Sequence, residues 1–255
     1  MVRVSGGPAL ARHRTAPAGL LLVAAAAAWV WLVTRWGGME AMPGTMGLNP
    51  PLFLGMWTLM VAAMMLPATA PVAALYARTV TAHRASRMAV FTAAYVLVWA
   101  AAGLPAYALS EGLGRASSLP PQAGTWVAAA VFAVSGVYQL TPLKDRCLVK
   151  CRSPLGMMLR YGSYPGPSRD LRAGAHHGVF CLGCCWSLMA LLAVFGVMNL
   201  WAMVVLTAVI TIEKLAPAGQ VVARGVGIAS IALAVAVFWA PGLAPGLTGD
   251  GMAGM

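Results

Sequence analysis

Long stretches without a charged side chain divide this sequence into regular segments. No Asp, Glu, Lys or Arg occurs in six intervals: residues 15–34, 41–77, 88–110, 116–143, 173–212 and 225–249. An α-helix needs about 20 mostly apolar residues to cross the hydrocarbon core of a membrane. Five of the intervals can hold one such helix each, and the interval 173–212 can hold two, separated by a turn at residues 196–199. The pattern therefore predicts seven membrane-spanning helices, at approximately residues 18–36, 52–77, 88–110, 122–142, 175–195, 199–215 and 225–242.

The composition agrees with a membrane protein and excludes a soluble globular domain. Apolar residues make up 60% of the 255 positions and charged residues only 9%, which leaves too little polar surface to cover a water-soluble fold. We therefore expect an all-α fold, a polytopic integral membrane helical bundle whose surface contacts the lipid bilayer. The first helix follows a basic segment, as a signal peptide does, but its apolar run is longer and its tryptophans suit a permanent interfacial anchor.

The positive charges predict which side of the membrane each loop faces. Fifteen of the seventeen Lys and Arg residues lie at the ends of predicted helices that share one face, and only Arg35 and Arg115 lie at the other. The positive-inside rule assigns the basic face to the cytoplasm. We therefore expect a multi-pass protein of the bacterial inner membrane, with its N-terminus inside and its C-terminus outside. Because the charges are spread over loop ends, they indicate attraction to anionic lipid and no nucleic-acid partner.

A single membrane domain accounts for most of the chain. We expect a basic cytoplasmic N-terminus at residues 1–17, one transmembrane bundle at residues 18–242 and a flexible C-terminal tail at residues 243–255. Within the bundle, residues 143–174 form a basic cytoplasmic loop. The sequence contains no nucleotide-binding glycine loop, no hydrolase elbow and no paired carboxylates within the membrane, so classical hydrolytic chemistry is not expected.

Two inner-face segments have more specific predictions. Pro142 ends the fourth helix, residues 143–152 form a short interfacial helix, and the remainder of the loop to Arg172 is irregular because of its glycines and prolines. Glu213 and Lys214 end the sixth helix, and we expect their charges to reach the membrane interface. A role for Glu213 as a ligand, proton carrier or counter-ion is the alternative.

Candidate chemistry is concentrated at the start of the fifth helix. Two histidines and three cysteines fall within ten residues there: His176, His177, Cys181, Cys184 and Cys185. All of these except His176 share one face of a helix. The other two cysteines, Cys147 and Cys151, lie in the predicted interfacial helix at the same membrane boundary. If the fourth and fifth helices pack together, all seven groups meet in one region.

Thiols on the cytoplasmic side stay reduced, so they indicate metal ligands or redox groups rather than disulfides. Thiolates select soft ions such as Cu(I), and also Zn(II) and iron–sulfur centres. The sequence therefore predicts a transition-metal site built from cysteine and histidine.

Methionines distinguish between these metals. Met56, Met60 and Met64 lie four residues apart and therefore along one side of the second helix, where Pro67 and Pro71 predict a kink. Three more lie in the preceding outer loop, at positions 39, 42 and 46. Thioether sulfur favours Cu(I) over Zn(II), so copper is favoured over zinc, and methionines followed by cysteines would let a soft cation pass from weak sites to strong ones. Simple gap-filling is the alternative interpretation of the stripe.

Two other functions use the same residues. The pair Cys181 and Cys184 has the spacing of a redox dithiol at a helix start, which would suit a membrane thiol–disulfide or quinone-linked protein. Haem ligation by His176 or His177 together with a methionine is a further alternative. The sequence leaves open whether the protein is an enzyme, and whether it works alone, with a protein partner or as a homo-oligomer.

Three segments resemble a bacterial family of uncharacterised, predicted metal-binding integral membrane proteins. They are residues 56–67, the stretch 138–144 with the cysteines that follow it, and residues 178–198 with the Glu-Lys pair at 213–214. The resemblance covers roughly residues 45–225 and implies a polytopic membrane protein with a bound metal. It supplies no reaction, so metal handling, delivery and transport all stay open. The residues that it assigns to the metal are Met56, Met60, Met64, Met65, Cys147, Cys151, Cys181, Cys184 and Cys185.

Overall fold

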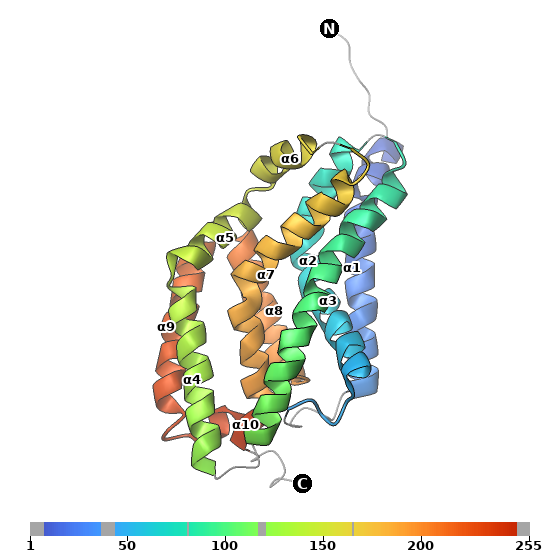
Figure 1. Ribbon diagram of the computed structural model, residues 1–255. Helices are drawn as coiled ribbons and strands as arrows, with labels where there is room; N and C mark the ends of the chain where they lie inside the picture. The colour runs from blue at the N-terminus through green and yellow to red at the C-terminus, as the bar shows by residue number, and fades with distance from the viewer. Residues whose placement is uncertain (1–7, 37–43, 81, 117–120, 165, 249–255) are drawn as a thin grey trace.

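The computed structural model describes residues 8–36, 44–80, 82–116, 121–164 and 166–248, and within these ranges the regular structure is entirely helical (Figure 1). The all-α prediction is therefore confirmed for the described residues. The helices are α1 (Pro8–Trp36), α2 (Pro50–Thr79), α3 (Arg84–Ala116), α4 (Pro121–Gln139), α5 (Pro142–Arg152), α6 (Pro154–Gly162), α7 (Arg169–Phe195), α8 (Leu200–Leu215), α9 (Gly219–Ala236), the 3-10 helix η1 (Pro241–Leu243) and α10 (Pro245–Thr248).

Five of the described helices are long and apolar enough to cross a membrane: α1, α2, α3, α7 and α9. A sixth span is obtained if α4 and α5 are counted together, although the two are bent by 62° at the break between them. Helix α8 has 16 residues and covers only about 24 Å at 1.5 Å per residue. The helices are thus compatible with a multi-pass membrane protein, while the count of seven spans and their orientation stay predictions.

Several helices have bounds that differ from those of the approximate predicted spans. The cytoplasmic loop contains a second helix, α6, where an irregular chain was expected, because Pro154 suits the first helical position. Helix α7 begins at Arg169 rather than at residue 175, and α9 occupies Gly219–Ala236 rather than 225–242. Two short helices, η1 and α10, lie in the segment around the predicted flexible tail, whose residues 249–255 lie outside the described ranges.

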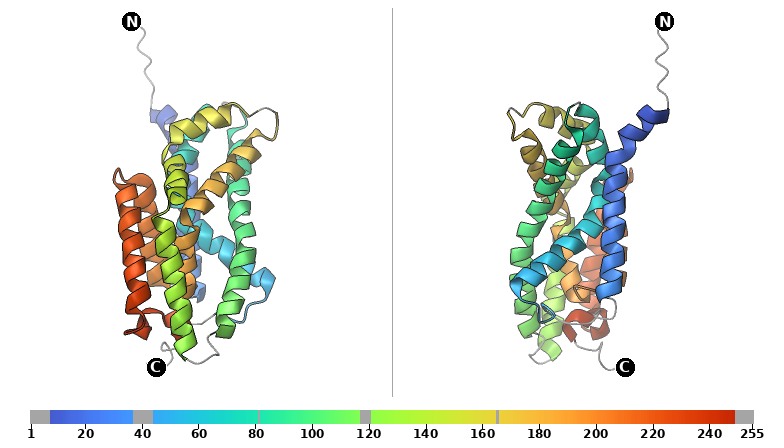
Figure 2. Two further views of the ribbon diagram at one scale, coloured as in Figure 1. Left: turned by 60° about the vertical axis from the view of Figure 1, so that its left-hand side comes forward. Right: turned by 90° about the vertical axis from the view of Figure 1, so that its right-hand side faces the viewer.

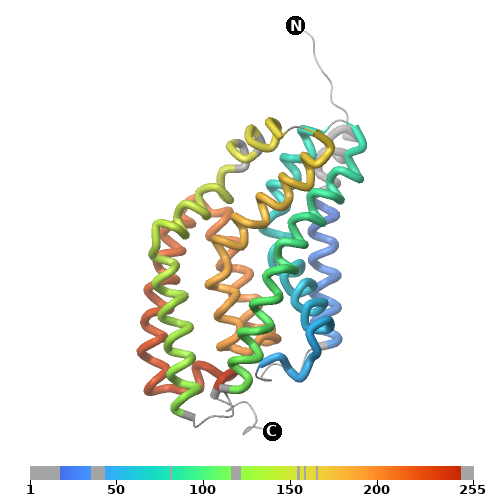
Figure 3. The backbone as a smooth tube through the Cα atoms, in the orientation of Figure 1, coloured from blue at the N-terminus to red at the C-terminus, as the bar shows by residue number. Residues whose placement is uncertain are grey.

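Helix α7 lies at the centre of the bundle. It packs against α3 on one side and against α4 and α5 on the other, while α1 packs on α2 and α4 packs on α9 (Figure 1). The chain path in Figure 3 runs from α4 through α5 and α6 at one end of the bundle before it returns as α7. The cysteines of α5 and α7 therefore approach each other although they are about thirty residues apart in the sequence.

The contact between α3 and α7 depends on a glycine. A Cβ atom on Gly174 would overlap the backbone carbonyl of Phe91 in α3. Small residues of this kind allow helix backbones to approach closely within membranes. One turn further along α3 and two turns further along α7, the same approach brings Tyr95 against Cys181, with 3.0 Å between the hydroxyl oxygen and the sulfur.

The contact between α1 and α2 involves a proline. Pro67 has no N–H, so the carbonyl of Ala63 lacks its usual partner within the helix. The indole Nε1 of Trp29 in α1 donates to that carbonyl at 3.1 Å. Figure 2 shows the two helices side by side. Helix α2 continues through both prolines, and the predicted kink beside Met64 stays a prediction.

Candidate functional site

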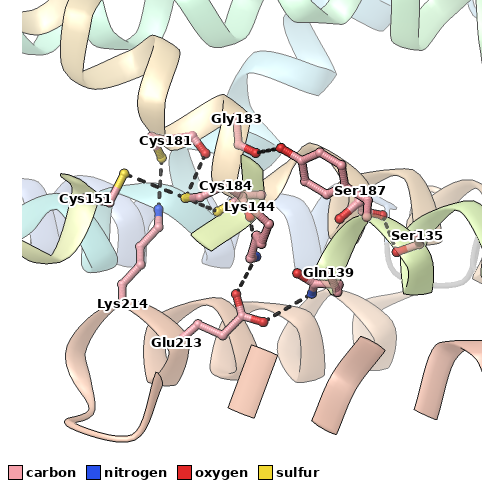
Figure 4. Close-up of polar contacts among 12 residues, drawn as sticks. Ser135, Gln139, Lys144, Cys151, Cys181, Gly183, Cys184, Ser187, Glu213 and Lys214 are labelled. Atoms are coloured by element: carbon pink, nitrogen blue, oxygen red, sulfur yellow. Dashed lines mark hydrogen bonds and ion pairs between the residues drawn. The ribbon is translucent and has the colours of Figure 1, made fainter. Parts of the chain in front are cut away.

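Four thiols gather where α5 meets α7, and we call Cys151, Cys181, Cys184 and Cys185 the sulfur cluster. Figure 4 shows the first three of them. The sulfur of Cys184 lies 3.2 Å from that of Cys185 and 3.7 Å from that of Cys151. The thiol of Cys184 also donates to the backbone carbonyl of Cys181 at 3.2 Å. All four cysteines are buried, and all five cysteines of the chain are free thiols. The structure therefore brings together four of the seven predicted Cys and His groups, since the other three cysteines of the cluster each contact the thiol of Cys184.

The fifth cysteine occupies a different place. Cys147 is half-buried and packs against Gly183, where an added Cβ would lie 3.0 Å from the Cys147 sulfur. The backbone carbonyl of Gly183 accepts a hydrogen bond from the hydroxyl of Tyr138. Cys147 thus lies at the edge of the α5–α7 contact, and its thiol faces a different part of α7 from the one that carries Cys184.

Histidines flank the sulfur cluster in aromatic surroundings. The ring of His177 is buried and stacks on Tyr95 with 5.5 Å between ring centroids. Its Nδ1 has no hydrogen-bond partner among the described residues. His176 points elsewhere: it packs edge-on against Phe180 at 4.6 Å and against Tyr161 at 5.7 Å. Burial raises the pKa of Tyr161 above its ordinary value, so this part of the site presents a neutral phenol.

The side chain of one lysine lies against the sulfur cluster. The ammonium of Lys214, from the last turn of α8, lies 2.9 Å from the sulfur of Cys181. The sulfur of Met65 in α2 is 4.0 Å from the same nitrogen. Lys214 is buried, with 8% of its surface exposed. The prediction that Lys214 reaches the membrane interface is therefore wrong, because the side chain turns inward to the thiols.

A buried ion pair lies beside the cluster. Lys144 of α5 and Glu213 of α8 are 2.7 Å apart, with 0% and 1% of their side-chain surfaces exposed. Lys144 also donates to the backbone carbonyl of Cys184, and the carboxylate of Glu213 accepts from the amide of Gln139 at 3.2 Å. These bonds join α4, α5, α7 and α8 at one point. The expectation that Glu213 reaches the interface is wrong, and a counter-ion role, the alternative from the sequence, agrees with this geometry.

The predicted methionine stripe is buried. Met56, Met60 and Met64 expose 3% or less of their surfaces, and Met65 is fully buried. From Met56 to Met65 the helix rises about 13 Å, and Met65 makes the contact with Lys214. In the outer loop Met46 is buried, whereas Met39 and Met42 lie outside the described residues. Buried methionines therefore extend along α2 as far as Met65, at positions that gap-filling core residues also occupy.

The predicted Cys/His metal centre is not formed as such. In the part of the chain that the structure describes, no three His, Cys, Asp or Glu side chains are arranged so that they could hold a metal ion. The side chains around the thiols also include groups outside that set, namely a thioether, a phenol and two ammonium groups. The donors present are therefore soft sulfur atoms next to fixed positive charge.

Sequence reasoning missed several of these neighbours. Tyr95 is one aromatic residue among many in an apolar helix, and no sequence pattern distinguishes it. Lys144, Glu213 and Lys214 did carry a signal, since charged residues at the ends of membrane helices are costly when they are buried and therefore functional candidates. Assigning them to the interface overlooked that α5 covers this end of α8.

Comparison with known proteins adds one finding. A family model named PpoB2 and described as a copper chaperone matches residues 54–237, which is most of the 255-residue chain. Comparison with curated proteins and with solved structures found no match. The matched range begins in α2, ends next to α9 and includes every residue of the sulfur cluster.

Proposed function

Because the chain belongs to the PpoB2 family of copper chaperones, we propose that it binds Cu(I) at the sulfur cluster and hands the ion on to a receiving protein. The cargo is held by two sulfur ligands at a time, either Cys181 with Met65 or Cys151 with Cys184. The observation that carries this proposal is the gathering of four buried thiols from α5 and α7 beside a methionine. Soft sulfur ligands of this kind select Cu(I).

Cu(I) differs from Zn(II) in the number of ligands that it requires. Zinc sites are nearly always tetrahedral, and three suitable side chains are not placed for such a site among the described residues. Cu(I) is satisfied by a pair of thiolates. The sulfur atoms of Cys151 and Cys184 are 3.7 Å apart, so they need to separate by only about 1 Å to hold an ion between them at about 2.3 Å from each.

The thioethers of α2 supply a route for the cargo. Met56, Met60 and Met64 lie along one side of the helix and are buried within the bundle. Thioethers bind Cu(I) more weakly than thiolates do, so an ion would move along the stripe towards the cysteines. His177 supplies a further donor atom. Its buried Nδ1 has no hydrogen-bond partner among the described residues, and an ion near Cys181 would give it one.

The membrane placement belongs to the same proposal. We assign the chain to the bacterial inner membrane as a single domain, with the α5–α6 end of the bundle on the cytoplasmic side because the basic residues concentrate there. The five helices of membrane length support a multi-pass protein. In this orientation the sulfur cluster lies near the cytoplasmic boundary and the methionine stripe begins near the outer one.

The redox and haem alternatives fit the geometry less well. A thiol–disulfide exchange enzyme needs a thiol that a partner can reach, whereas Cys181 and Cys184 are fully buried. Haem ligation needs open space beside a histidine, whereas His177 is stacked on Tyr95 and His176 is enclosed by aromatic rings.

Elemental analysis of the protein after Cu(I) loading tests the proposal. Wild-type protein in detergent is incubated anaerobically with Cu(I), desalted and assayed for bound copper. The double variant Cys151→Ser/Cys184→Ser is expected to lose most of the bound ion, whereas Cys147→Ser, the matched control at the edge of the contact, is expected to retain it. Equal copper in both variants would refute the sulfur cluster as the site.

A further inference from the structure

The ammonium of Lys214 has an unusual set of neighbours. Its closest polar contacts are two sulfur atoms, those of Cys181 at 2.9 Å and of Met65 at 4.0 Å. The hydroxyl oxygen of Tyr95 lies 3.0 Å from the same Cys181 sulfur. Lysine ammonium groups are strongly hydrated point charges, and a buried one usually pairs with carboxylate oxygen. The ammonium of Lys214 is therefore a buried cation whose nearest partners among the described residues are sulfur atoms rather than carboxylate oxygens.

The neighbouring lysine shows the contrast. Lys144 is paired with Glu213 at 2.7 Å and donates to a backbone carbonyl. The single buried carboxylate beside the cluster is thus already neutralised, and among the described residues it is held by Lys144 and Gln139 rather than by Lys214. The charge of Lys214 is left to face the thiols. A thiolate at Cys181 is the group that balances it, because an uncompensated charge in a low-dielectric interior is costly.

A Cu(I) ion bound to Cys181 and Met65 would compete with this ammonium for the same sulfur atoms. Both cations carry a single positive charge, so exchanging one for the other leaves the buried charge of the site unchanged. A divalent ion in the same place would add a further unit of charge, and electrostatic interactions are strong in such surroundings. The arrangement therefore matches a monovalent soft cation.

The position of Lys214 in the chain permits the exchange. It is the penultimate residue of α8, which ends at Leu215, and Leu215 itself is 52% exposed. Lysine carries its charge on a long flexible stem that can run along an apolar surface to water. Lys214 is also not completely enclosed, since 8% of its surface is exposed. A change of rotamer can thus move the ammonium from the sulfur atoms towards the end of the bundle.

We propose that Lys214 is an exchangeable internal cation of the sulfur cluster: its ammonium leaves Cys181 and Met65 when Cu(I) binds and returns when the ion is handed on. This inference rests on the proposed function, because it assumes that the sulfur cluster is the copper site. It assigns Lys214 a regulatory role in loading and release rather than a role as a ligand.

Amine labelling of the wild-type protein tests the exchange. The chain has only three lysines, and two serve as internal controls: Lys150 is exposed and Lys144 is fully buried in its ion pair. Protein in detergent is treated briefly with a small acylating reagent, with and without one equivalent of Cu(I), and the modified lysines are quantified by mass spectrometry. Loading should raise the labelling rate of Lys214 at least about tenfold, because labelling follows exposure, with Lys144 protected and Lys150 labelled throughout.

Bound copper is measured in the same samples, so that failure of the proposed function can be distinguished from failure of the exchange proposal. If no copper binds, the proposed function fails. If copper binds stoichiometrically and Lys214 stays as protected as Lys144, the exchange proposal alone is overturned. Ag(I) is the charge control, because it is a soft monovalent ion like Cu(I) and should raise Lys214 labelling to a similar extent. Stoichiometric Ag(I) binding with Lys214 still protected would overturn the match to a monovalent ion.

A variant gives a second measurement. Lys214→Leu removes the charge and adds no donor atom for Cu(I). Departure of Cu(I) would then leave a buried thiolate without a cation, which is costly, so transfer of bound Cu(I) to a chromogenic chelator should slow by about tenfold, equivalent to about 1.4 kcal/mol in the barrier. Transfer that is equally fast or faster in the variant would overturn the proposal.

Discussion

The ion pair between Lys144 and Glu213 is the interaction whose loss should destabilise the bundle most clearly. The two side chains are 2.7 Å apart and almost fully buried, and their further bonds to Cys184 and Gln139 fix α5 and α8 to α7 and α4. Replacing Lys144 with Met leaves the Glu213 carboxylate without its cation. Replacing Glu213 with Gln leaves the ammonium without its anion.

The expected magnitude follows from burial. Removing one partner of a buried pair costs about 3–5 kcal/mol, because the remaining charge is uncompensated, whereas removing both charges is often nearly neutral. Each single variant should therefore lower the free energy of unfolding by about 3–5 kcal/mol. The double variant Lys144→Met/Glu213→Gln should lose less than either single variant. At about 2–4 °C per kcal/mol for a chain of this size, each single change lowers Tm by about 6–20 °C.

The buried thiols provide the assay. A dye that becomes fluorescent on reaction with thiols reports unfolding of the detergent-solubilised protein on heating, because four of its five cysteines are buried. Arg115→Gln is the matched control. It removes an ion pair with Glu111 in which the arginine side chain is 81% exposed, and it should change the free energy of unfolding by less than about 1 kcal/mol. Additive losses in the double variant would show that Lys144 and Glu213 are not coupled, and the reasoning would be wrong.

Two further predictions concern helix contacts and use the same thermal assay. Trp29→Phe removes the donor to the Ala63 carbonyl and should lower the free energy of unfolding by about 1–3 kcal/mol. Adding Pro67→Ala restores a backbone N–H and should recover most of that loss. A double variant no more stable than Trp29→Phe would contradict the assignment. Gly174→Ala places a Cβ against the α3 backbone and should cost about 1–3 kcal/mol by overpacking, whereas Gly112→Ala, which meets nothing within 4 Å, should be neutral or stabilising. Equal effects of the two glycine substitutions would remove the argument for close contact at α3 and α7.

The main helices could be predicted from the sequence because charge-free intervals report directly on membrane-length segments. Their ends could not, since helix ends depend on local bonds. Helix α7 starts early because Asp170 in its first turn pairs with Arg87 of α3 at 2.8 Å, a contact across more than eighty residues. Helix α6 was missed because its short run of apolar residues lies among glycines and prolines that indicate a loop.

The candidate site was predictable in part for a related reason. The spacing of Cys181, Cys184 and Cys185 defines one helix face without knowledge of the fold, and the structure buries all three. The separation of Cys147 from the other thiols depends on how α5 lies across α7. The place of Lys214 depends on the packing of α8 beneath α5, and a hydropathy pattern assigns such a residue to the nearest interface by default.

The bond from Trp29 to Ala63 has a consequence for how the chain enters a bilayer. In α2 alone, the carbonyl of Ala63 has no hydrogen-bond partner within the helix, because Pro67 lacks an N–H. An unsatisfied backbone group costs several kcal/mol in hydrocarbon. Helix α1 is synthesised first and brings the missing donor. We therefore expect α1 and α2 to enter lipid together as a hairpin, because α2 alone would have to draw water into the membrane with it.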